Sequence, residues 1–294
     1  MMTDMRFATD MQPFFKDVQS HYDLSDDFFA LFLDPTRTYS CAYFNDPDAT
    51  LEEAQRAKID LSLGKCELRA GMKLLDIGCG WGATALRAAE HYRASVIGLT
   101  LSENQYAHAT QLARESGSSN DLEFRLQGWE EFNQPVDRIV SIGAFEHFRT
   151  SRHDAFFKRC REILPAGGIM MLHCIVTPSL ADLRESGIEF CHEDVKFARF
   201  IRDEIFPGGQ LCTPARIRSL SSQNGFDVYH VQPLRLHYAR TLDCWAESLG
   251  KNREQAIAIT SQTVYDRYLK YLAGCAEQFR KGTIDVMQFC MRRV

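Results

Sequence analysis

Short apolar runs alternate with helix-length amphipathic segments from residue 73 to residue 290. The runs have the length of buried strands, and the segments between them repeat their apolar residues with the period of a helix. This alternation is typical of a doubly wound α/β fold. We therefore predict a seven-stranded Rossmann-like sheet with crossover helices. The expected strands span residues 73–77, 95–99, 123–127, 138–142, 168–174, 226–231 and 285–291, and the expected helices span 83–91, 102–115, 152–163 and 214–224.

Three segments lie outside this alternation. Residues 1–60 contain helices and turns, including an amphipathic helix over 51–63 that is capped by Thr50. An insertion over 178–211 carries its own helix, 193–206, which Pro207 stops. Residues 239–281 are almost wholly helical. Ligands of open parallel sheets bind beyond the carboxyl ends of the strands. We expect one domain over 1–294, with an N-terminal helical cover and two insertions that form a lid.

Composition argues against a nucleic-acid-binding, membrane-spanning or disulfide-rich protein. The 294 residues carry 34 Lys and Arg against 39 Asp and Glu, a net charge of −5. A nucleic-acid partner is therefore not expected, because phosphate binding needs a basic excess. No apolar run reaches the ~20 residues of a transmembrane helix, and no secretory leader is apparent, so we expect a cytoplasmic protein. The ten cysteines are scattered singly, which favours free thiols and no structural metal.

A glycine-rich turn follows the first expected strand. Residues 75–82 read LDIGCGWG, and a helix begins directly afterwards. The dinucleotide fingerprint does not fit: the third glycine comes one position early, and the second strand ends in GLTLS (98–102) without a carboxylate for a ribose. Asp76, just before the glycines, suits a ligand with an ammonium group. The turn therefore predicts a site for S-adenosylmethionine, whose methionine part carries such a group.

Further blocks occur in order along nearly the whole chain. They read HYD (21–23), SDDFF (25–29), YSCAYF (39–44), NQ (104–105), GWE (128–130), DRIVS (137–141), FEHF (145–148), EIFPGG (204–209), HY (237–238) and YLAGC (271–275). With these blocks and the glycine turn, the chain resembles the S-adenosylmethionine-dependent mycolic acid cyclopropane synthases and their methyltransferase relatives.

The resemblance implies a set of cofactor contacts. Residues from the N-terminal cover would reach the methionine end, the glycine turn would form the bed, Gln105 would bind the ribose, and Trp129 with Glu130 would hold the adenine. The full set is Tyr39, Ser40, Leu74, Asp76, Gly78, Gly80, Gly82, Thr100, Leu101, Gln105, Trp129, Glu130 and Ile142.

Methyl transfer to an isolated alkene leaves a carbocation. Such a cation must be kept from water, faced by aromatic rings or carbonyl oxygens, and deprotonated by a nearby base. The aromatic candidates are Tyr22, Phe145, Phe148, Phe200 and Tyr265 or Tyr268, and the polar candidates are Glu146, His173 and Tyr238. Glu146 and His173 follow or end neighbouring strands, so we expect both to point into the crevice above the sheet.

The resemblance implies that a bicarbonate ion is the base. Glu146, His173, Tyr238, the Cys41 backbone and the carbonyl near Ile142 would hold it. A carboxylate beside an anion requires a shared proton, so we expect Glu146 and bicarbonate to titrate as a pair. Cys275 belongs to a motif regarded as catalytic in this family, although the mechanism needs no covalent intermediate.

The predicted reaction is cyclopropane ring formation on a long unsaturated, mycolic-type acyl chain. Relatives that hydrate the cation carry an acid where this chain has Gly143, which favours ring closure, with methyl branching as the alternative. The acyl chain would be presented on an acyl carrier protein, and Arg199, Arg202 and Arg216 would face that carrier or merely be solvated. The segment 191–194 is more polar than a lid over an alkyl chain requires. An N- or O-methyltransferase of a small acceptor and a noncatalytic lipid or cofactor sensor are the other hypotheses.

Overall fold

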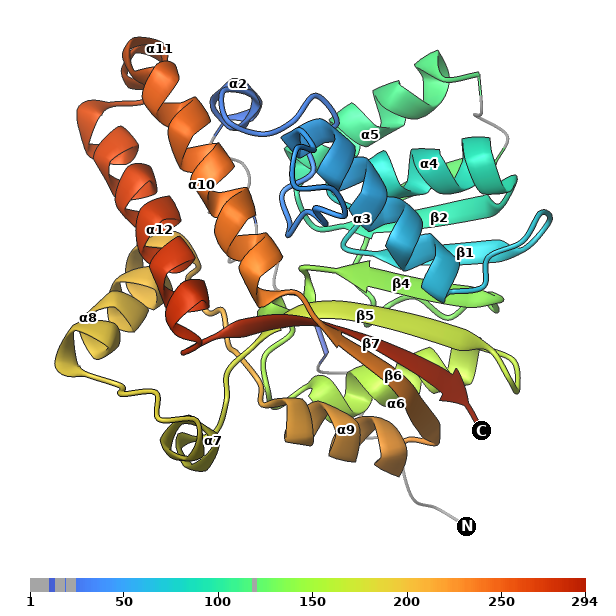
Figure 1. Ribbon diagram of the computed structural model, residues 1–294. Coiled ribbons are helices and arrows are strands. Elements are labelled where there is room, and N and C mark those ends of the chain that lie inside the picture. The colour runs from blue at the N-terminus through green and yellow to red at the C-terminus, as the bar shows by residue number, and fades with distance from the viewer. Residues whose placement is uncertain (1–10, 14–18, 20–24, 118–120) are drawn as a thin grey trace.

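A mixed seven-stranded sheet forms the centre of the computed structural model, which describes residues 11–13, 19, 25–117 and 121–294 (Figure 1). The strand order is β3-β2-β1-β4-β5-β7-β6, and the predicted seven-stranded Rossmann-like fold is confirmed. The first five strands pair in parallel. The strands are β1 (Lys73–Ile77), β2 (Ser95–Thr100), β3 (Leu122–Leu126), β4 (Arg138–Ile142), β5 (Ile169–Val176), β6 (Phe226–Pro233) and β7 (Asp285–Arg293).

Helices cover both faces of the sheet (Figure 1). On one face lie α3 (Leu51–Lys65), α4 (Ala83–Tyr92) and α5 (Glu103–Glu115), and on the other lie α6 (His153–Ile163) and α9 (Pro214–Gln223). Each face buries its own apolar core. These bounds lie within a few residues of the expected helices, because the apolar stripe of each helix faces the sheet.

The last strand runs against its neighbours. Strand β7 is antiparallel to both β5 and β6, and it lies between them. Strands β6 and β7 therefore form an antiparallel pair, and the long connection between them lies at the edge where the parallel strands end. It contains α10 (Arg235–Lys251), α11 (Arg253–Ile259) and α12 (Gln262–Lys281), of which α10 and α12 lie side by side (Figure 1). The helical insertion over 239–281 is thus placed over the crevice.

The other insertion forms α7 (Leu180–Glu185), α8 (His192–Phe200) and the π-helical segment η2 (Ile201–Ile205). We expected a continuous helix over 193–206. The structure keeps the span but widens its last part into a π-helix, after which Pro207 prevents continuation. Both ends of the insertion return to the sheet edge, where Val176 bridges Cys212.

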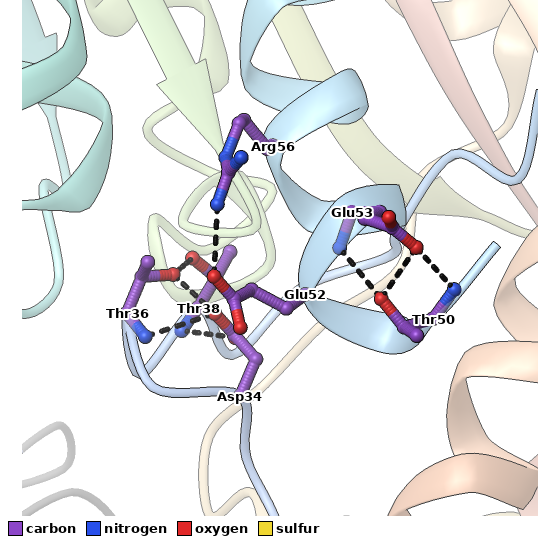
Figure 2. Close-up of polar contacts among 7 residues, drawn as sticks. All are labelled: Asp34, Thr36, Thr38, Thr50, Glu52, Glu53 and Arg56. Atoms are coloured by element: carbon purple, nitrogen blue, oxygen red, sulfur yellow. Dashed lines mark hydrogen bonds and ion pairs between the residues drawn. The ribbon is translucent and has the colours of Figure 1, made fainter.

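The N-terminal cover is held by local polar turns (Figure 2). The Asp34 carboxylate accepts hydrogen bonds from the backbone N–H of Thr36 (2.9 Å) and of Thr38 (3.0 Å) and from the Thr36 hydroxyl. This turn leads directly into Tyr39. Helix α3 then begins with the expected Thr50 cap, completed by Glu53 as a capping box. The short helix α2 (Asp26–Ala30) precedes the turn.

Helix α3 differs from a simple amphipathic helix. Gln55, Lys58 and Ser62 are buried at spacings of three and four residues, so a polar stripe faces the interior. Gln55 donates to the Ser40 carbonyl oxygen (2.8 Å), and Lys58 donates to the Ser40 hydroxyl (2.8 Å). The stripe therefore supports the loop that carries Ser40.

Among the helices of the described residues, none has the length and apolar character needed to cross a bilayer.

Candidate functional site

A cavity surrounds the glycine turn at the carboxyl ends of β1, β2 and β4. Gly78 has a φ of +80°, and an added Cβ would lie 2.3 Å from the Cβ of Ala144. Only glycine therefore fits there, for both conformational and steric reasons. The turn lets a ligand approach the backbone closely where helix α4 begins.

Asp76 and Lys58 are the charged groups at the base of this cavity. Asp76 is buried, and its Oδ2 has no partner among the described residues. Burial raises the pKa of Asp76 to about 7, although the neighbouring Lys58 opposes the shift. Burial also lowers the pKa of Lys58 to about 8. A bound ammonium group would complete the coordination of Asp76 and favour its ionised form.

The far end of the same cavity contains Trp129 and Glu130. Glu130 Oε1 accepts from Arg152 (3.2 Å), whereas Glu130 Oε2 and the indole nitrogen of Trp129 are buried without partners among the described residues. Gly128 makes room here, because a Cβ on it would lie 2.5 Å from both Glu130 Oε2 and Pro13. An aromatic face beside an unsatisfied carboxylate oxygen matches a purine with an exocyclic amine.

Gln105 lies between these two ends. The Thr100 hydroxyl donates to Gln105 Oε1 (2.8 Å), which fixes the orientation of the amide. Both residues are buried and line the cavity.

The structure brings most of the predicted cofactor contacts together. The residues that line this cavity are Tyr39, Ser40, Asp76, Gly78, Gly80, Thr100, Leu101, Gln105, Trp129, Glu130 and Ile142. Leu74 and Gly82 are not among them. The Leu74 side chain packs in the core under α3 and α4, and Gly82 instead caps α4 with a φ of +97°.

A second, larger cavity of about 330 Å³ meets the first. Tyr39, Ser40, Gly143 and His147 line both cavities, so the two share a wall at the ends of the Ser40 loop and β4. The second cavity is mostly apolar. Its lining includes Phe190, Phe197, Ile201, Phe206, Leu211, Leu242, Tyr271, Phe279, Ile284 and Val286.

Glu146 brings a carboxyl group into this apolar cavity. It lies in the 3-10 helix η1 (Phe145–His147) after β4, and its Oε1 accepts from the backbone N–H of Ile175 (2.6 Å). Its Oε2 is buried without a partner among the described residues. Burial raises the pKa of Glu146 to about 7. The side chain is thus poised to hold or release a proton near neutral pH.

His173, the fifth of the eight residues of β5, pairs with Ile142 at the end of β4 and lines the same cavity. Its Nδ1 lies 3.2 Å from Gln288 Nε2, and its Nε2 is buried without a partner among the described residues. Burial lowers the pKa of His173 well below its ordinary value, and the nearby Lys58 and Lys65 lower it further. The imidazole is therefore neutral. Glu146 and His173 converge on one cavity, as we expected, although β5 continues to Val176 and His173 does not end it.

Tyr238, Cys41 and Cys275 also line the apolar cavity. Burial raises the pKa of the Tyr238 phenol well above its ordinary value, so the hydroxyl keeps its proton. Burial likewise raises the pKa values of both thiols. The Cys41 thiol donates to the Ala42 carbonyl oxygen (3.1 Å). Because the thiolate is the nucleophilic form of cysteine, neither residue is activated for covalent chemistry.

Comparison with known proteins places this arrangement in a family. The family model described as mycolic acid cyclopropane synthetase matches residues 9–289. The chain belongs to this family.

Cyclopropane mycolic acid synthase 3 of Mycobacterium tuberculosis is 56% identical over 286 residues, which are 97% of this chain and 100% of that protein. The solved cyclopropane synthase MmaA2 from Mycobacterium tuberculosis is 54% identical, with a TM-score of 0.95 over 97% of this chain and 100% of that one. The mycolic acid cyclopropane synthase CmaA1, solved with SAH and CTAB, is 54% identical, with a TM-score of 0.94 over 96% and 99% of the two chains. The predicted class of enzyme, an S-adenosylmethionine-dependent methyltransferase of the cyclopropane synthase type, is confirmed.

The aromatic residues that this family member turns toward its apolar cavity differ from those we expected. Phe145 packs in the core under β4. Phe200, Tyr265 and Tyr268 are buried in a cluster with residues of α2, α10 and α12, and they do not line the apolar cavity. Phe148 lines the first cavity, and Tyr22 lies outside the described residues. The aromatic lining comes instead from other residues of the same two insertions, which are Phe197, Phe206, Tyr271 and Phe279. Periodicity marks these helices as amphipathic but does not say which apolar residues meet a core and which meet a cavity.

The polar segment 191–194 has a structural role. Asp194 is buried, caps α8 through the backbone N–H of Cys191 (2.7 Å), pairs with Lys281 (2.5 Å) and accepts from Gln278 (2.9 Å). These contacts attach helix α8 to the C-terminal end of α12. The polar segment therefore anchors this insertion, while Phe197 and Ile201, farther along it, line the cavity.

Proposed function

We propose that this enzyme transfers a methyl group to the double bond of a long unsaturated, mycolic-type acyl chain and closes a cyclopropane ring. The observation that carries the proposal is the shared wall between the two cavities. A polar cavity built for the cofactor meets an apolar cavity that holds Glu146 and His173. This arrangement suits an electrophilic donor and an apolar acceptor better than it suits a small polar substrate.

The first cavity fits S-adenosylmethionine through its unsatisfied atoms. Asp76 Oδ2 would accept from the amino group, and Glu130 Oε2 would accept from the adenine amine. The cradle around Gly78 would admit the backbone approach of the methionine part. When bound, the cofactor supplies an electrophilic methyl group on a sulfonium sulfur. Tyr39 and Ser40 would line its path into the second cavity.

The residues of the apolar cavity would protect the positive charge that methyl addition creates on the acyl chain. The aromatic rings of Tyr271, Phe206 and Phe279 would face the charge and exclude water. The Tyr238 hydroxyl and the His173 imidazole would donate hydrogen bonds to a bicarbonate ion, and Glu146 would share a proton with it. Bicarbonate would supply the base that takes the proton released on ring closure.

Two features support the proposed substrate. The apolar lining continues from Glu146 to the lid residues Phe190 and Leu211, and the related CmaA1 was solved with CTAB, which carries a long alkyl chain. The proposal extends to how the substrate is presented.

Arg199 and Arg202 are exposed on the lid beside the apolar cavity. We propose that these two side chains bind an acidic acyl carrier protein, and that the reaction takes place in the cytoplasm.

Gly143 supports ring closure over hydration. It lines both cavities, has a φ of +67° and carries no side chain that would bind a water molecule there. Without an ordered water, the cation is expected to lose a proton. Ring closure and methyl branching each add one CH2 to the acyl chain, whereas hydration adds a further water.

The test combines the purified enzyme, S-adenosylmethionine and unsaturated acyl chains on an acyl carrier protein, with product analysis by mass spectrometry and nuclear magnetic resonance. We expect a product heavier by one CH2 that shows cyclopropane protons. Turnover should fall in decarbonated buffer and return when bicarbonate is added. A hydroxylated or branched product would contradict ring closure and show that the enzyme hydrates the cation or forms a methyl branch. Cofactor binding without transfer to any acyl chain, or transfer to small amines, would overturn the proposal.

A further inference from the structure

A row of polar side chains crosses the sheet beside the apolar cavity. His173 on β5 lies opposite Gln288 on β7, and Gln288 lies opposite Gln232 on β6. Paired residues of neighbouring strands point to the same side of a sheet, so these three side chains share one face. Ser62 and Lys65 of helix α3 meet the row on that face.

Lys65 fixes the orientation of the Gln288 amide. The Lys65 ammonium donates to Gln288 Oε1 (2.6 Å) and to Gln232 Oε1. An ammonium group has no lone pair to accept a hydrogen bond, so the amide oxygen of Gln288, and not its nitrogen, must face Lys65. The amide nitrogen is thereby turned to the other side.

Ser62 requires the same orientation. The Ser62 hydroxyl donates its single proton to the Lys58 carbonyl oxygen (2.8 Å), so it can only accept from Gln288 Nε2 (3.1 Å). The second N–H of the same amide group points at His173 Nδ1 (3.2 Å). A ring nitrogen that faces a donor must carry a lone pair.

We propose that Gln288 and Lys65 are positioning residues that hold His173 as its Nε2–H tautomer and make the imidazole a hydrogen-bond donor into the apolar cavity. His173 Nε2 is buried beside that cavity with no partner among the described residues, which leaves its N–H for a ligand. His173 then acts as a donor to a bound anion, and not as the base of the reaction. The catalytic consequence rests on the proposed function, but the tautomer does not.

Nitrogen-15 spectroscopy tests the tautomer without a substrate. Protonated and unprotonated ring nitrogens of a neutral imidazole differ widely in chemical shift. We would label the nine histidines of the full-length enzyme and assign His173 by the signals lost in His173→Gln. The wild type should show a protonated Nε2 and an unprotonated Nδ1. A protonated Nδ1 in the wild type would overturn the proposal.

Substitutions test the relay. In Gln288→Glu the carboxylate can only accept, so Nδ1 should gain a proton while the contact with Lys65 is kept. In Lys65→Met the amide is free to turn, and both tautomers should be populated. Gln232→Leu is the matched control, because it removes the other partner of Lys65 and leaves the contact between Gln288 and His173; its spectrum and turnover should match the wild type. An unprotonated Nδ1 in a folded Gln288→Glu variant would overturn the proposal, with folding checked by calorimetry of SAH binding.

Turnover separates this inference from the proposed function. With SAH affinity unchanged, Gln288→Glu should lower kcat by roughly tenfold to a hundredfold, the scale of one hydrogen bond to a charged group. A shifted tautomer with unchanged kcat would overturn the positioning role while methyl transfer still stands. If the wild type has the Nε2–H tautomer but converts no unsaturated acyl chain, the proposed function fails and the assignment of the tautomer is supported.

Discussion

Several buried polar atoms have no partner among the described residues and belong to side chains that line the two cavities. They are atoms of Asp76, Trp129 and Glu130 at the first cavity, and of Glu146 and His173 at the apolar cavity. Leaving a buried polar group unpaired costs roughly 1–3 kcal/mol. At the two cavities, a bound ligand with matching polar groups would relieve this cost.

Substitutions of Glu146 and Cys275 distinguish an acid-base mechanism from a covalent one. Glu146→Gln should lose nearly all methyl transfer, because the amide cannot share a proton with a bound base. Cys275→Ser should keep a measurable fraction, because burial raises the pKa of the thiol and leaves no thiolate to attack. Radiolabelled methyl transfer to an unsaturated acyl chain measures both, with SAH calorimetry as the control for folding. An inactive Cys275→Ser beside an active Glu146→Gln would reverse these roles.

At the scale of elements, the alternation of apolar runs was sufficient to predict the strands and the helices that cross between them. It could not predict that β7 would lie antiparallel between β5 and β6, since strand order depends on contacts between distant segments. Helix α3 was also incompletely predicted. Its apolar residues suggested an ordinary amphipathic helix, but its Gln55, Lys58 and Ser62 face the interior because the Ser40 loop and β7 supply their hydrogen-bond partners.

The candidate site was likewise predicted only in part from the sequence. The glycine turn and the convergence of Glu146 and His173 on one cavity could be inferred from the sequence, because parallel strands bring their carboxyl ends to one edge. The aromatic wall could not be inferred, because the rotation of α8 and α12 about their axes decides whether Phe197 or Phe200 faces the cavity.

Close packing of α8 on α12 sets the shape of the apolar cavity. A Cβ on Gly274 of α12 would lie 2.2 Å from the Phe197 ring, which lines that cavity. Gly274→Ala should therefore displace Phe197 and raise KM for the acyl substrate about fivefold or more, since overpacking costs roughly 1–3 kcal/mol. SAH affinity should stay unchanged. Gly250→Ala on α10 is the control, because its Cβ meets nothing within 4 Å and should stabilise the helix by about 0.5–1 kcal/mol. An unchanged KM in Gly274→Ala would show that α8 does not shape the substrate site.

Helix α2 fastens the N-terminal cover to the glycine turn. Asp26 accepts from the indole N–H of Trp81 (3.0 Å) and pairs with Arg37 (3.2 Å), and both of these partners line the first cavity, in which we propose that the cofactor binds. Asp26→Ala should weaken SAH binding by about tenfold, the scale of one hydrogen bond to a charged group. Asp27→Ala, at the exposed neighbouring position, should bind SAH like the wild type. Calorimetry measures both, and equal affinities of the two variants would contradict a role of α2 in holding the cofactor.

At the scale of the whole molecule, the buried carboxyl groups of the candidate site lower the free energy of unfolding near neutral pH. Burial raises the pKa values of Glu146 and Asp76 to about 7 in the folded state, against ordinary values of 4.5 and 3.8. The folded state therefore binds protons more tightly than the unfolded chain, and stability must fall as the pH rises through this interval. Sites that need such groups are commonly less stable than the same fold without them.

Glu146→Gln isolates this effect, because the amide oxygen still accepts from the Ile175 N–H but the group cannot ionise. At pH 5 neither folded protein carries a charge at this position, and the two free energies of unfolding should differ by only about 1 kcal/mol. Between pH 5 and pH 8 the wild type should lose stability relative to Glu146→Gln by about 2.5 kcal/mol, since the loss accrues over roughly two pH units up to the folded pKa of about 7, and one pKa unit corresponds to 1.36 kcal/mol. Urea unfolding at both pH values measures the difference, and Glu185→Gln on the exposed face of α7 should follow the wild type. A gap between Glu146→Gln and the wild type that stays constant with pH would mean that Glu146 is already ionised in the folded enzyme, and sharing of a proton with a bound base would then lose its physical basis.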